Sequence, residues 1–249
     1  MFEVYIALGD SMSIDFYPAQ DAERVGLDVR EDIGSASLLF RNESSLFPDF
    51  DERDLQTRFS GIQYKNLAVD GATCEDSLLQ DYFPQDEMNQ LANQGRALVT
   101  LTLGGNDLLH ARRRSQGDDL KSLQKEFFAV QERYEKVVLL IREKFSDCVL
   151  MLTTVYDPTD GSGILPTTSP LYGGDLPIEF LEQFNSFVRD LARSHGLLLA
   201  DVHKHFLGHG ATCGTAENFW FWPASPIEPS YRGASEIRRV WLATLDSHV

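Results

Sequence analysis

Short apolar runs that end in glycine and polar residues recur along this chain. The first run, Val4 to Leu8, is β-prone and stops at Gly9-Asp10-Ser11. A run of this kind is typical of a strand that is buried on both faces of a sheet. Similar runs alternate with longer segments of helical spacing, which predicts an α/β fold with a doubly wound parallel sheet and helices on both faces. The expected strands are Val4 to Leu8, Ile62 to Val69, Ala97 to Leu103, Cys148 to Val155 and Leu197 to Val202.

The segments between these strands predict the covering helices. Asp118 to Phe145 spaces its apolar residues mostly by three and four, as an amphipathic helix does. Leu176 to His195 is expected to form another helix, and Ala234 to Leu245 a third. Thr73 is expected to cap a short helix that runs through Leu79.

Other segments are expected to connect these elements over the surface. The acidic stretch from about Asp15 to Asp32 is expected to be a solvated loop, since its spacing matches no EF-hand calcium loop. Ser162 to Asp175 is rich in Gly, Pro, Ser and Thr and is also expected to be a loop. The aromatic segment Phe219 to Trp222 has three open interpretations: a wall of an acyl pocket, a surface that stacks on a sugar, or packed core.

Length and composition narrow the classes of protein. The 249 residues contain no linker or repeat, which predicts one domain over 1–249. A net charge of −16 argues against binding nucleic acid or anionic membrane surfaces. No apolar run approaches the ~20 residues of a membrane span, and no secretion signal is visible. The sparse cysteines, without a C-x-x-C spacing, favour reduced thiols and a cytoplasmic location; they are Cys74, Cys148 and Cys213.

Polar residues follow several of the expected strands directly, and the carboxyl ends of parallel strands share one edge of the sheet. Ser11 is therefore a candidate nucleophile, although Asp10 or Ser11 serving only as a helix cap is the simpler alternative. The backbone N–H groups of Ser11 and Gly71 and the Asn106 side chain are candidate donors to an oxyanion, which is the arrangement that acyl transfer needs. No G-x-G-x-x-G or P-loop motif is present, which counts against a nucleotide or flavin binder and predicts no cofactor.

Together these motifs resemble the SGNH, or GDSL-type, hydrolase family. The resemblance rests on Gly9-Asp10-Ser11, the D-G-A-T block with Gly71, the G-G-N-D block at 104–107 and E-P-S-Y-R-G before the last helix. It implies a flavodoxin-like five-stranded sheet in the order 2-1-3-4-5 and hydrolysis or transfer of ester-bound acyl groups without a metal. It also implies that Ser11 is the nucleophile and that Gly71 and Asn106 are the oxyanion donors.

The last block departs from the family pattern D-x-x-H-P. The aligned residues are Ser225-Pro226-Ile227-Glu228-Pro229, so that Glu228 stands where the family has its histidine and Ser225 where it has its aspartate. Three hypotheses follow. Glu228 is itself the base, with a pKa raised by apolar neighbours; a histidine of the segment 203–209, with His209 the freest to reach inward, is the base and Glu228 orients it; or the site binds its ligand without turning it over.

Two further groups of polar residues have simpler explanations. His203, His205 and His209 have spacings that also suit zinc, but a surface turn is the favoured interpretation and no metal is predicted. Asp157 and Asp160 are expected to shape a turn.

Taken together, the motifs predict a serine esterase or acyl hydrolase that acts on a small ester or acetylated substrate. The alternative is a non-catalytic or acyl-transferring relative that binds such a ligand; a purely structural protein has no need for Ser, Gly and Asn at three converging strand ends.

Overall fold

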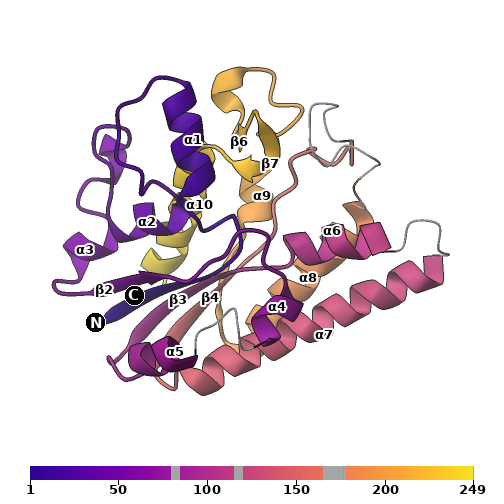
Figure 1. Cartoon of the computed structure of the whole chain (residues 1–249), viewed down its shortest axis with the longest axis horizontal. Helices are drawn as coiled ribbons and strands as arrows, with labels where there is room; N and C mark the ends of the chain where they lie inside the picture. The colour runs from indigo at the N-terminus through magenta and orange to yellow at the C-terminus, as the bar shows by residue number, and fades with distance from the viewer. Residues whose placement is uncertain (80–84, 115–119, 165–175, 177, 249) are drawn as a thin grey trace.

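A five-stranded parallel sheet forms the centre of the computed structural model, which describes residues 1–79, 85–114, 120–164, 176 and 178–248 (Figure 1). The strand order is β2-β1-β3-β4-β5, and every neighbouring pair is parallel, as the sequence predicted. The strands are somewhat shorter than expected at the two edges of the sheet. Their bounds are β1 Val4–Gly9, β2 Gln63–Asn66, β3 Ala97–Thr102, β4 Cys148–Thr153 and β5 Leu198–Ala200.

The sheet is buried on both faces. Along β1, Val4, Ile6 and Leu8 belong to one hydrophobic core, whereas the alternate residues Tyr5 and Ala7 belong to the other. This alternation is the period of two that a strand imposes on its side chains. β1 therefore runs through the middle of the molecule, and its carboxyl end is surrounded by neighbouring elements.

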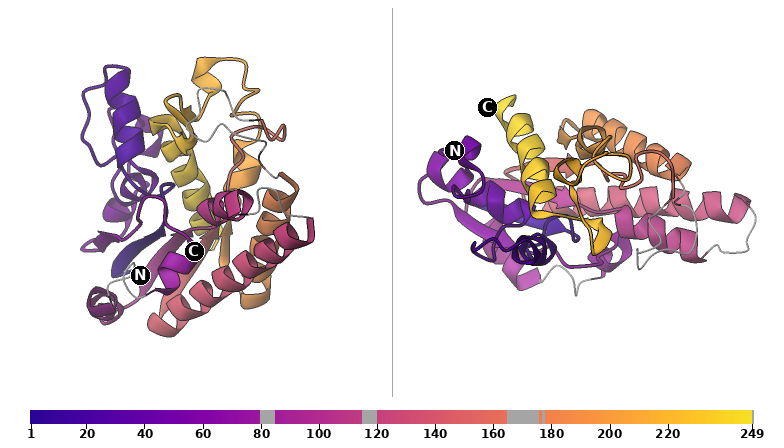
Figure 2. Two further views of the ribbon diagram at one scale, coloured as in Figure 1. Left: turned by 45° about the vertical axis from the view of Figure 1, so that its right-hand side comes forward. Right: turned by 90° about the horizontal axis from the view of Figure 1, so that it is seen from above.

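Two groups of helices cover the two faces. The first core is closed by α4 to α8, and the second mainly by α2, α3, α9 and α10. The long helix α7 and the C-terminal helix α10 lie apart in both views of Figure 2, as expected of helices on opposite faces. The helices on the first face are α4 Cys74–Leu78, α5 Gln85–Ala92, α6 Gly105–Arg114, α7 Leu120–Lys144 and α8 Ile178–His195. The remaining helices are α1 Phe16–Arg24, α2 Ser35–Phe40, α3 Leu55–Arg58, α9 Val202–Phe206 and α10 Tyr231–Asp246, with short 3-10 turns at Pro48–Phe50 and Ala216–Asn218.

The sequence missed one helix in the acidic stretch 15–32. Phe16–Arg24 forms α1 instead of a solvated loop. Ala22 is fully buried in a small third core with Ile33, and Asp21 is buried beside Arg24. Acidic residues suggested solvent exposure, but Asp21 is satisfied by a neighbour three residues along the helix.

Two segments near the C-terminus also differ from the expected turns and loops. The histidine-rich turn begins as helix α9, which Asp201 caps by accepting a hydrogen bond from the Lys204 N–H. The aromatic segment contributes β6 Phe221–Trp222, which pairs antiparallel with β7 Ser225–Pro229. Short elements of this kind carry too few residues to show a period in the sequence. Residues 118–119 of the expected long helix, 165–175 of the expected loop and 177 lie outside the described residues.

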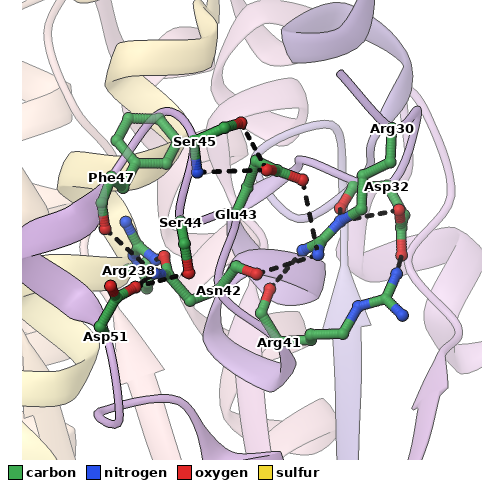
Figure 3. A network of polar contacts seen from close by, with 10 residues as sticks. All are labelled: Arg30, Asp32, Arg41, Asn42, Glu43, Ser44, Ser45, Phe47, Asp51 and Arg238. Carbon is green, nitrogen blue, oxygen red and sulfur yellow. Dashed lines mark hydrogen bonds and ion pairs between the residues drawn. The ribbon is translucent and has the colours of Figure 1, made fainter.

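Helix α10 is fixed to the segment after α2 by a buried arginine (Figure 3). The Arg238 guanidinium donates to Asn42 Oδ1 at 2.6 Å and to Ser235 Oγ at 2.5 Å, and lies 3.7 Å from the centre of the Phe50 ring. The Asn42 amide in turn donates to the Phe47 carbonyl and to Asp51. This network holds α10, the helix that follows β7.

None of the described helices is both long and apolar enough to cross a membrane.

Candidate active site

The end of β1 places Ser11 at the carboxyl edge of the sheet. Gly9 has φ +138°, and a Cβ at this position would overlap the backbone carbonyl and side chain of Thr102 on β3. Asp10 Oδ1 then accepts a hydrogen bond from the Met12 N–H at 3.1 Å, which closes a tight turn around Ser11. The next helix, α1, begins four residues beyond the turn, with Asp15 as its N-cap residue. Neither Asp10 nor Ser11 therefore caps a helix.

Two neighbouring residues of the G-G-N-D block hold the loop that contains Gly71. The Asn106 side-chain amide donates to the Ala72 carbonyl at 3.1 Å. Both carboxylate oxygens of Asp107 accept from the Cys74 N–H, at 3.1 and 2.9 Å. Gly71 itself has φ +73° with open space where a Cβ would be, so this turn needs glycine for its left-handed backbone rather than for close packing. Asp107 was not singled out from the sequence, although it belongs to the quoted block.

The segment that carries Glu228 is fixed on both sides. The hydroxyl of Tyr156, in the segment that follows β4, donates to the Ile227 carbonyl at 2.8 Å. Ser230 caps α10 by accepting from the Gly233 N–H, and its hydroxyl donates to the Trp220 carbonyl. Gly233 is required here, because a Cβ would overlap that same carbonyl. The E-P-S-Y-R-G block is thus a helix start that holds β7 in position.

These elements line a cavity of about 80 Å³ that opens at the carboxyl edge of the sheet. Ser11, Asn106 and Glu228, which stand far apart in the sequence, all line it, whereas Gly71 lies in the adjoining loop and is exposed. Most of the remaining wall is apolar. The lining residues are Asp10, Ser11, Met12, Gly105, Asn106, Leu108, Leu109, Val155, Tyr156, Pro158, Leu176, Leu181, Ile227 and Glu228.

Burial raises the pKa of both carboxyl groups in this cavity. The pKa of Glu228 rises to about 7, an effect that hydrogen bonding with the Ser11 side chain partly offsets and the charge of Asp70 increases. Glu228 Oε2 is buried without a hydrogen-bond partner among the described residues. The pKa of Asp10 rises to about 8, mainly because of burial and despite the hydrogen bond from Met12. The cavity therefore favours uncharged carboxyl groups below neutral pH.

Tyr17 is a neighbour of this site that the sequence did not reveal. Its hydroxyl donates to Asp70 Oδ2 at 2.8 Å, beside Gly71, and its ring lies 5.5 Å from that of Trp222. Burial and the nearby carboxylates of Asp70 and Glu228 raise the Tyr17 pKa. Tyr17 lies on α1, the helix that was not predicted because its stretch of the sequence is acidic. No local pattern indicated that Tyr17 would lie beside this site.

The histidines do not reach the cavity. His209 Nδ1 lies 2.9 Å from the Asn218 carbonyl oxygen. Because a carbonyl oxygen can only accept, Nδ1 is the donor of this hydrogen bond and carries the proton. Its ring stacks on Trp220. His203 lies 3.4 Å from Glu182 and His205 lies 2.8 Å from Glu236. Each histidine has a different partner, and the described residues contain no group of three or more His, Cys, Asp or Glu side chains placed to hold a metal.

The other candidate side chains have structural positions. Asp157 accepts from the Thr159 and Gly161 N–H groups, and Asp160 accepts from the loop after α9 at Gly208, Gly210 and Thr212, which confirms that both shape turns. In the aromatic segment, Phe221 is fully buried and Trp220 packs on Phe206. None of Phe219 to Trp222 lines the cavity that contains Ser11, so this segment belongs mainly to the packed core.

Solved structures of known proteins share the fold. No curated protein matches the chain. Among solved structures, a lipase from the goat rumen metagenome has a TM-score of 0.64 at 18% identity, with 97% of this chain and 96% of that chain covered. Phospholipase A1 from Streptomyces albidoflavus has a TM-score of 0.58 at 17% identity, with 100% of each chain covered. An acetylxylan esterase from Geobacillus stearothermophilus has a TM-score of 0.57 at 16% identity, with 98% of this chain and 94% of that chain covered.

The model of the GDSL-like Lipase/Acylhydrolase family matches residues 7–217. The match includes Ser11, Gly71 and Asn106 and ends before β7, the strand that carries Glu228. A match of this extent, on a sheet of the order implied by the motifs, leads to one conclusion: the chain belongs to the GDSL-like lipase/acylhydrolase family.

Proposed function

We propose that this protein is a serine esterase that hydrolyses a small ester or acetylated substrate, with Ser11 as nucleophile and Glu228 as its base. The observation that carries the proposal is the meeting of Ser11, Asn106 and Glu228 in one cavity. Family membership supports ester hydrolysis as the reaction. The pKa of Glu228 supports its role, because a carboxyl with a pKa of about 7 accepts a proton far better near neutral pH than one with the ordinary value.

In the proposed mechanism the ionised Glu228 takes the hydroxyl proton of Ser11 while Oγ attacks the ester carbonyl. The oxyanion receives hydrogen bonds from the Ser11 and Gly71 backbone N–H groups and from the Asn106 amide, which has one N–H left besides the one donated to Ala72. As the intermediate collapses, Glu228 returns the proton to the leaving alcohol. Water then attacks the acyl group on Ser11 by the same route, which releases the acid and restores the serine.

The structure favours the direct role of Glu228 over a histidine base. His209 is held by the Asn218 carbonyl and the Trp220 ring, and it does not line the cavity. The same applies to His203 and His205, which contact Glu182 and Glu236. We therefore assign no catalytic role to the histidine segment.

A second candidate function is binding or acyl transfer without rapid hydrolysis. The unpartnered Glu228 Oε2 favours it, because no described side chain orients the carboxyl as the aspartate of the family orients its histidine. In an acyl transferase a second hydroxyl compound, rather than water, takes the acyl group from Ser11. Hydrolysis and acyl transfer share the attack by Ser11, whereas a non-catalytic binder lacks this step.

Hydrolysis of p-nitrophenyl acetate and butyrate by four forms of the protein tests the proposal. Ser11→Ala and Glu228→Ala are expected to lose at least about a hundredfold in kcat, and His209→Ala is the matched control that keeps wild-type activity. Full activity of Ser11→Ala would contradict the proposal. No turnover by the wild type, together with no labelling of Ser11 by a fluorophosphonate, would favour the non-catalytic binder.

The natural substrate is best sought among acetylated sugars and simple acyl esters. The neighbours in fold include an acetylxylan esterase and lipases, which defines the first compounds to assay. We also propose a cytoplasmic location, because all three cysteines are free thiols. Fractionation of the native host with an antibody against the protein tests this point.

A further inference from the structure

Tyr17 joins two sides of the candidate active site, although it is not itself a lining residue of the cavity. We propose that Tyr17 is a positioning residue for the reaction: through its hydrogen bond to Asp70 it holds the turn that presents the Gly71 N–H to the oxyanion. This inference rests on the proposed function, which assigns the Gly71 N–H to that task.

Gly71 lies at the third position of a tight turn whose two ends are anchored. The Ala72 N–H donates to the Val69 carbonyl at 3.1 Å, which closes the turn and leaves the Gly71 N–H out of its hydrogen bond. Asp70 has no positive φ and Gly71 has φ +73°, the combination of a type II turn. The Val69 N–H donates to the last carbonyl of β1, and the Ala72 carbonyl accepts from Asn106. These anchors fix the ends of the turn but not its central peptide, which carries the candidate oxyanion donor.

The Asp70 side chain anchors that central peptide, and Tyr17 holds the side chain. The Tyr17 hydroxyl donates to Asp70 Oδ2 at 2.8 Å, a charge-assisted contact from α1 to the residue directly before the candidate donor. The Tyr17 ring is itself held, since it lies 5.5 Å from the ring of Trp222 on β6 and 5.2 Å from that of Phe16. β6 pairs with β7, the strand of the proposed base. Tyr17 therefore connects the element of the base to the turn of the oxyanion donor.

The exposure of this contact separates a role in positioning from a role in folding. Asp70 is exposed and Tyr17 is half-buried, so water replaces the lost hydrogen bond at little cost in stability. The same loss affects the reaction more strongly, because a catalytic group that is misplaced by about 1 Å costs up to about a hundredfold in rate. Removal of the Tyr17 hydroxyl is therefore expected to lower the rate far more than the stability.

The charge of Asp70 gives a second readout that folding alone does not move. This charge raises the pKa of Glu228. The other ionisable groups that face Glu228 are Asp10, Tyr17 and Tyr156, so none of these described neighbours is a cation. Removal of the Asp70 charge lowers the pKa of Glu228, and the rising limb of kcat against pH then moves to lower pH.

Variants of the pair, assayed with p-nitrophenyl acetate, separate the hydrogen bond from the charge. Tyr17→Phe and Asp70→Ala both remove the hydrogen bond, and each is expected to lower kcat about tenfold with little change in KM. The double variant is expected to lose no more than either single variant, because the two side chains act as one unit. Phe16→Leu, an exposed neighbour of Tyr17 on α1, is the matched control and keeps the wild-type kcat.

Asp70→Asn keeps an acceptor for the Tyr17 hydroxyl but removes the charge. We expect its kcat at the plateau of the pH profile to stay within about twofold of the wild type, with the rising limb about half a pH unit lower. Wild-type kcat in Tyr17→Phe, additive losses in the double variant, or the same loss in Phe16→Leu would overturn the positioning role. An equal loss in Asp70→Asn and Asp70→Ala would overturn it too, because the hydrogen bond would then not be the cause.

The rate at which a fluorophosphonate labels Ser11 separates this inference from the proposed function, since the phosphonyl oxygen needs the same donors as the oxyanion. Slower labelling of Tyr17→Phe, with no ester hydrolysis by the wild type, would leave the positioning role standing and contradict the esterase. Ester hydrolysis with wild-type kcat in Tyr17→Phe would do the reverse. Neither hydrolysis by the wild type nor a difference in labelling would overturn both.

Discussion

In the proposed mechanism Glu228 takes the place of a histidine, and it is a weaker and more costly base for Ser11. An ordinary glutamate with a pKa near 4.5 accepts a serine proton poorly. Burial in an apolar cavity raises its pKa to about 7, close to the value at which general bases act best at neutral pH. The free energy needed to ionise the buried carboxyl comes from the stability of the fold, so the proposed base is expected to destabilise the protein whenever it is charged.

The pH dependence of stability measures this cost. The folded-state pKa of Glu228 lies above that of the unfolded chain, so the folded state binds more protons between about pH 4.5 and 7 and stability falls as pH rises through this range. Glu228→Gln removes the ionisation. We expect the variant to be more stable than the wild type at pH 8 by up to about 3 kcal/mol, with the difference shrinking toward pH 4. Urea unfolding of both proteins at pH 4 and pH 8 measures this stability difference. A difference that does not change with pH would contradict the prediction.

Residues were predictable from the sequence where a motif names them, and not where only the fold brings them together. Ser11, Asn106 and Glu228 stand in recognisable blocks, and the structure brings them into one cavity. Tyr17 approaches Asp70 across 53 positions of the chain, a contact that no local pattern encodes. His209 was the opposite case: its flanking glycines suggested freedom, but a carbonyl and an aromatic ring hold it away from the cavity.

At the scale of elements, the short helix α4 links the two candidate oxyanion donors. Asp107 of α6 accepts from the first N–H of α4, and the preceding Asn106 contacts Ala72. Asp107 thereby fixes the distance between α6 and the loop of Gly71. A change at Asp107 is expected to move the loop without touching Ser11 or Glu228.

Asp107→Ala is predicted to lower kcat about tenfold with little change in KM, and to destabilise the fold by about 1–3 kcal/mol because the Cys74 N–H loses its buried acceptor. Asp76→Ala is the matched control: Asp76 belongs to the capping box of α4, where its carboxylate accepts hydrogen bonds from the Thr73 N–H and hydroxyl. We expect it to destabilise the helix by about 1 kcal/mol and to leave kcat nearly unchanged. Steady-state kinetics and thermal unfolding of both variants test this prediction. A kcat of Asp107→Ala equal to that of Asp76→Ala would refute a positioning role for Asp107.

Elements with a clear period were predicted well. The buried strands and the long amphipathic helices all occur, because each keeps its period over enough residues to be recognised. Helix α1 was missed because its inward residues include Asp21, whose charge is satisfied by Arg24. The pair β6 and β7 was missed because its strands are short and contain proline at Pro226 and Pro229, which is unusual within a sheet.

For the whole molecule, one buried arginine joins α10 to the layer formed by α2 and the segment after it. Burial lowers the pKa of Arg238 to about 9, and its Nε has no partner among the described residues. The other guanidinium nitrogens are satisfied by Asn42 and Ser235, and the group stacks on Phe50. Because α10 follows β7 directly, this contact also supports the position of Glu228.

Arg238→Ala is expected to destabilise the protein by about 3–5 kcal/mol, since it opens a cavity and leaves Asn42 Oδ1 buried without a donor. Arg238→Met fills most of the space without a charge and is expected to cost clearly less than the alanine variant. Urea unfolding at pH 7 measures both values. Equal stability of Arg238→Ala and the wild type would show that the buried contact contributes nothing to docking α10.

The order of the sheet followed from the resemblance of the motifs to a family, while the burial pattern of β1 followed from its sequence alone. The second core and the network around Arg238 depend on packing between segments almost two hundred residues apart, as the separation of Asn42 and Arg238 shows. Such contacts leave no local signal. The single domain over 1–249 stays a prediction.

The central claim, that Glu228 activates Ser11, is tested most directly by the rate at which a fluorophosphonate labels Ser11 as a function of pH. Peptide mass spectrometry locates the label in the wild type and in Glu228→Gln. We expect labelling at Ser11, a rate that rises with pH around an apparent pKa of about 7, and a loss of at least about a hundredfold in Glu228→Gln. Labelling at another residue, or a wild-type rate in Glu228→Gln, would contradict it.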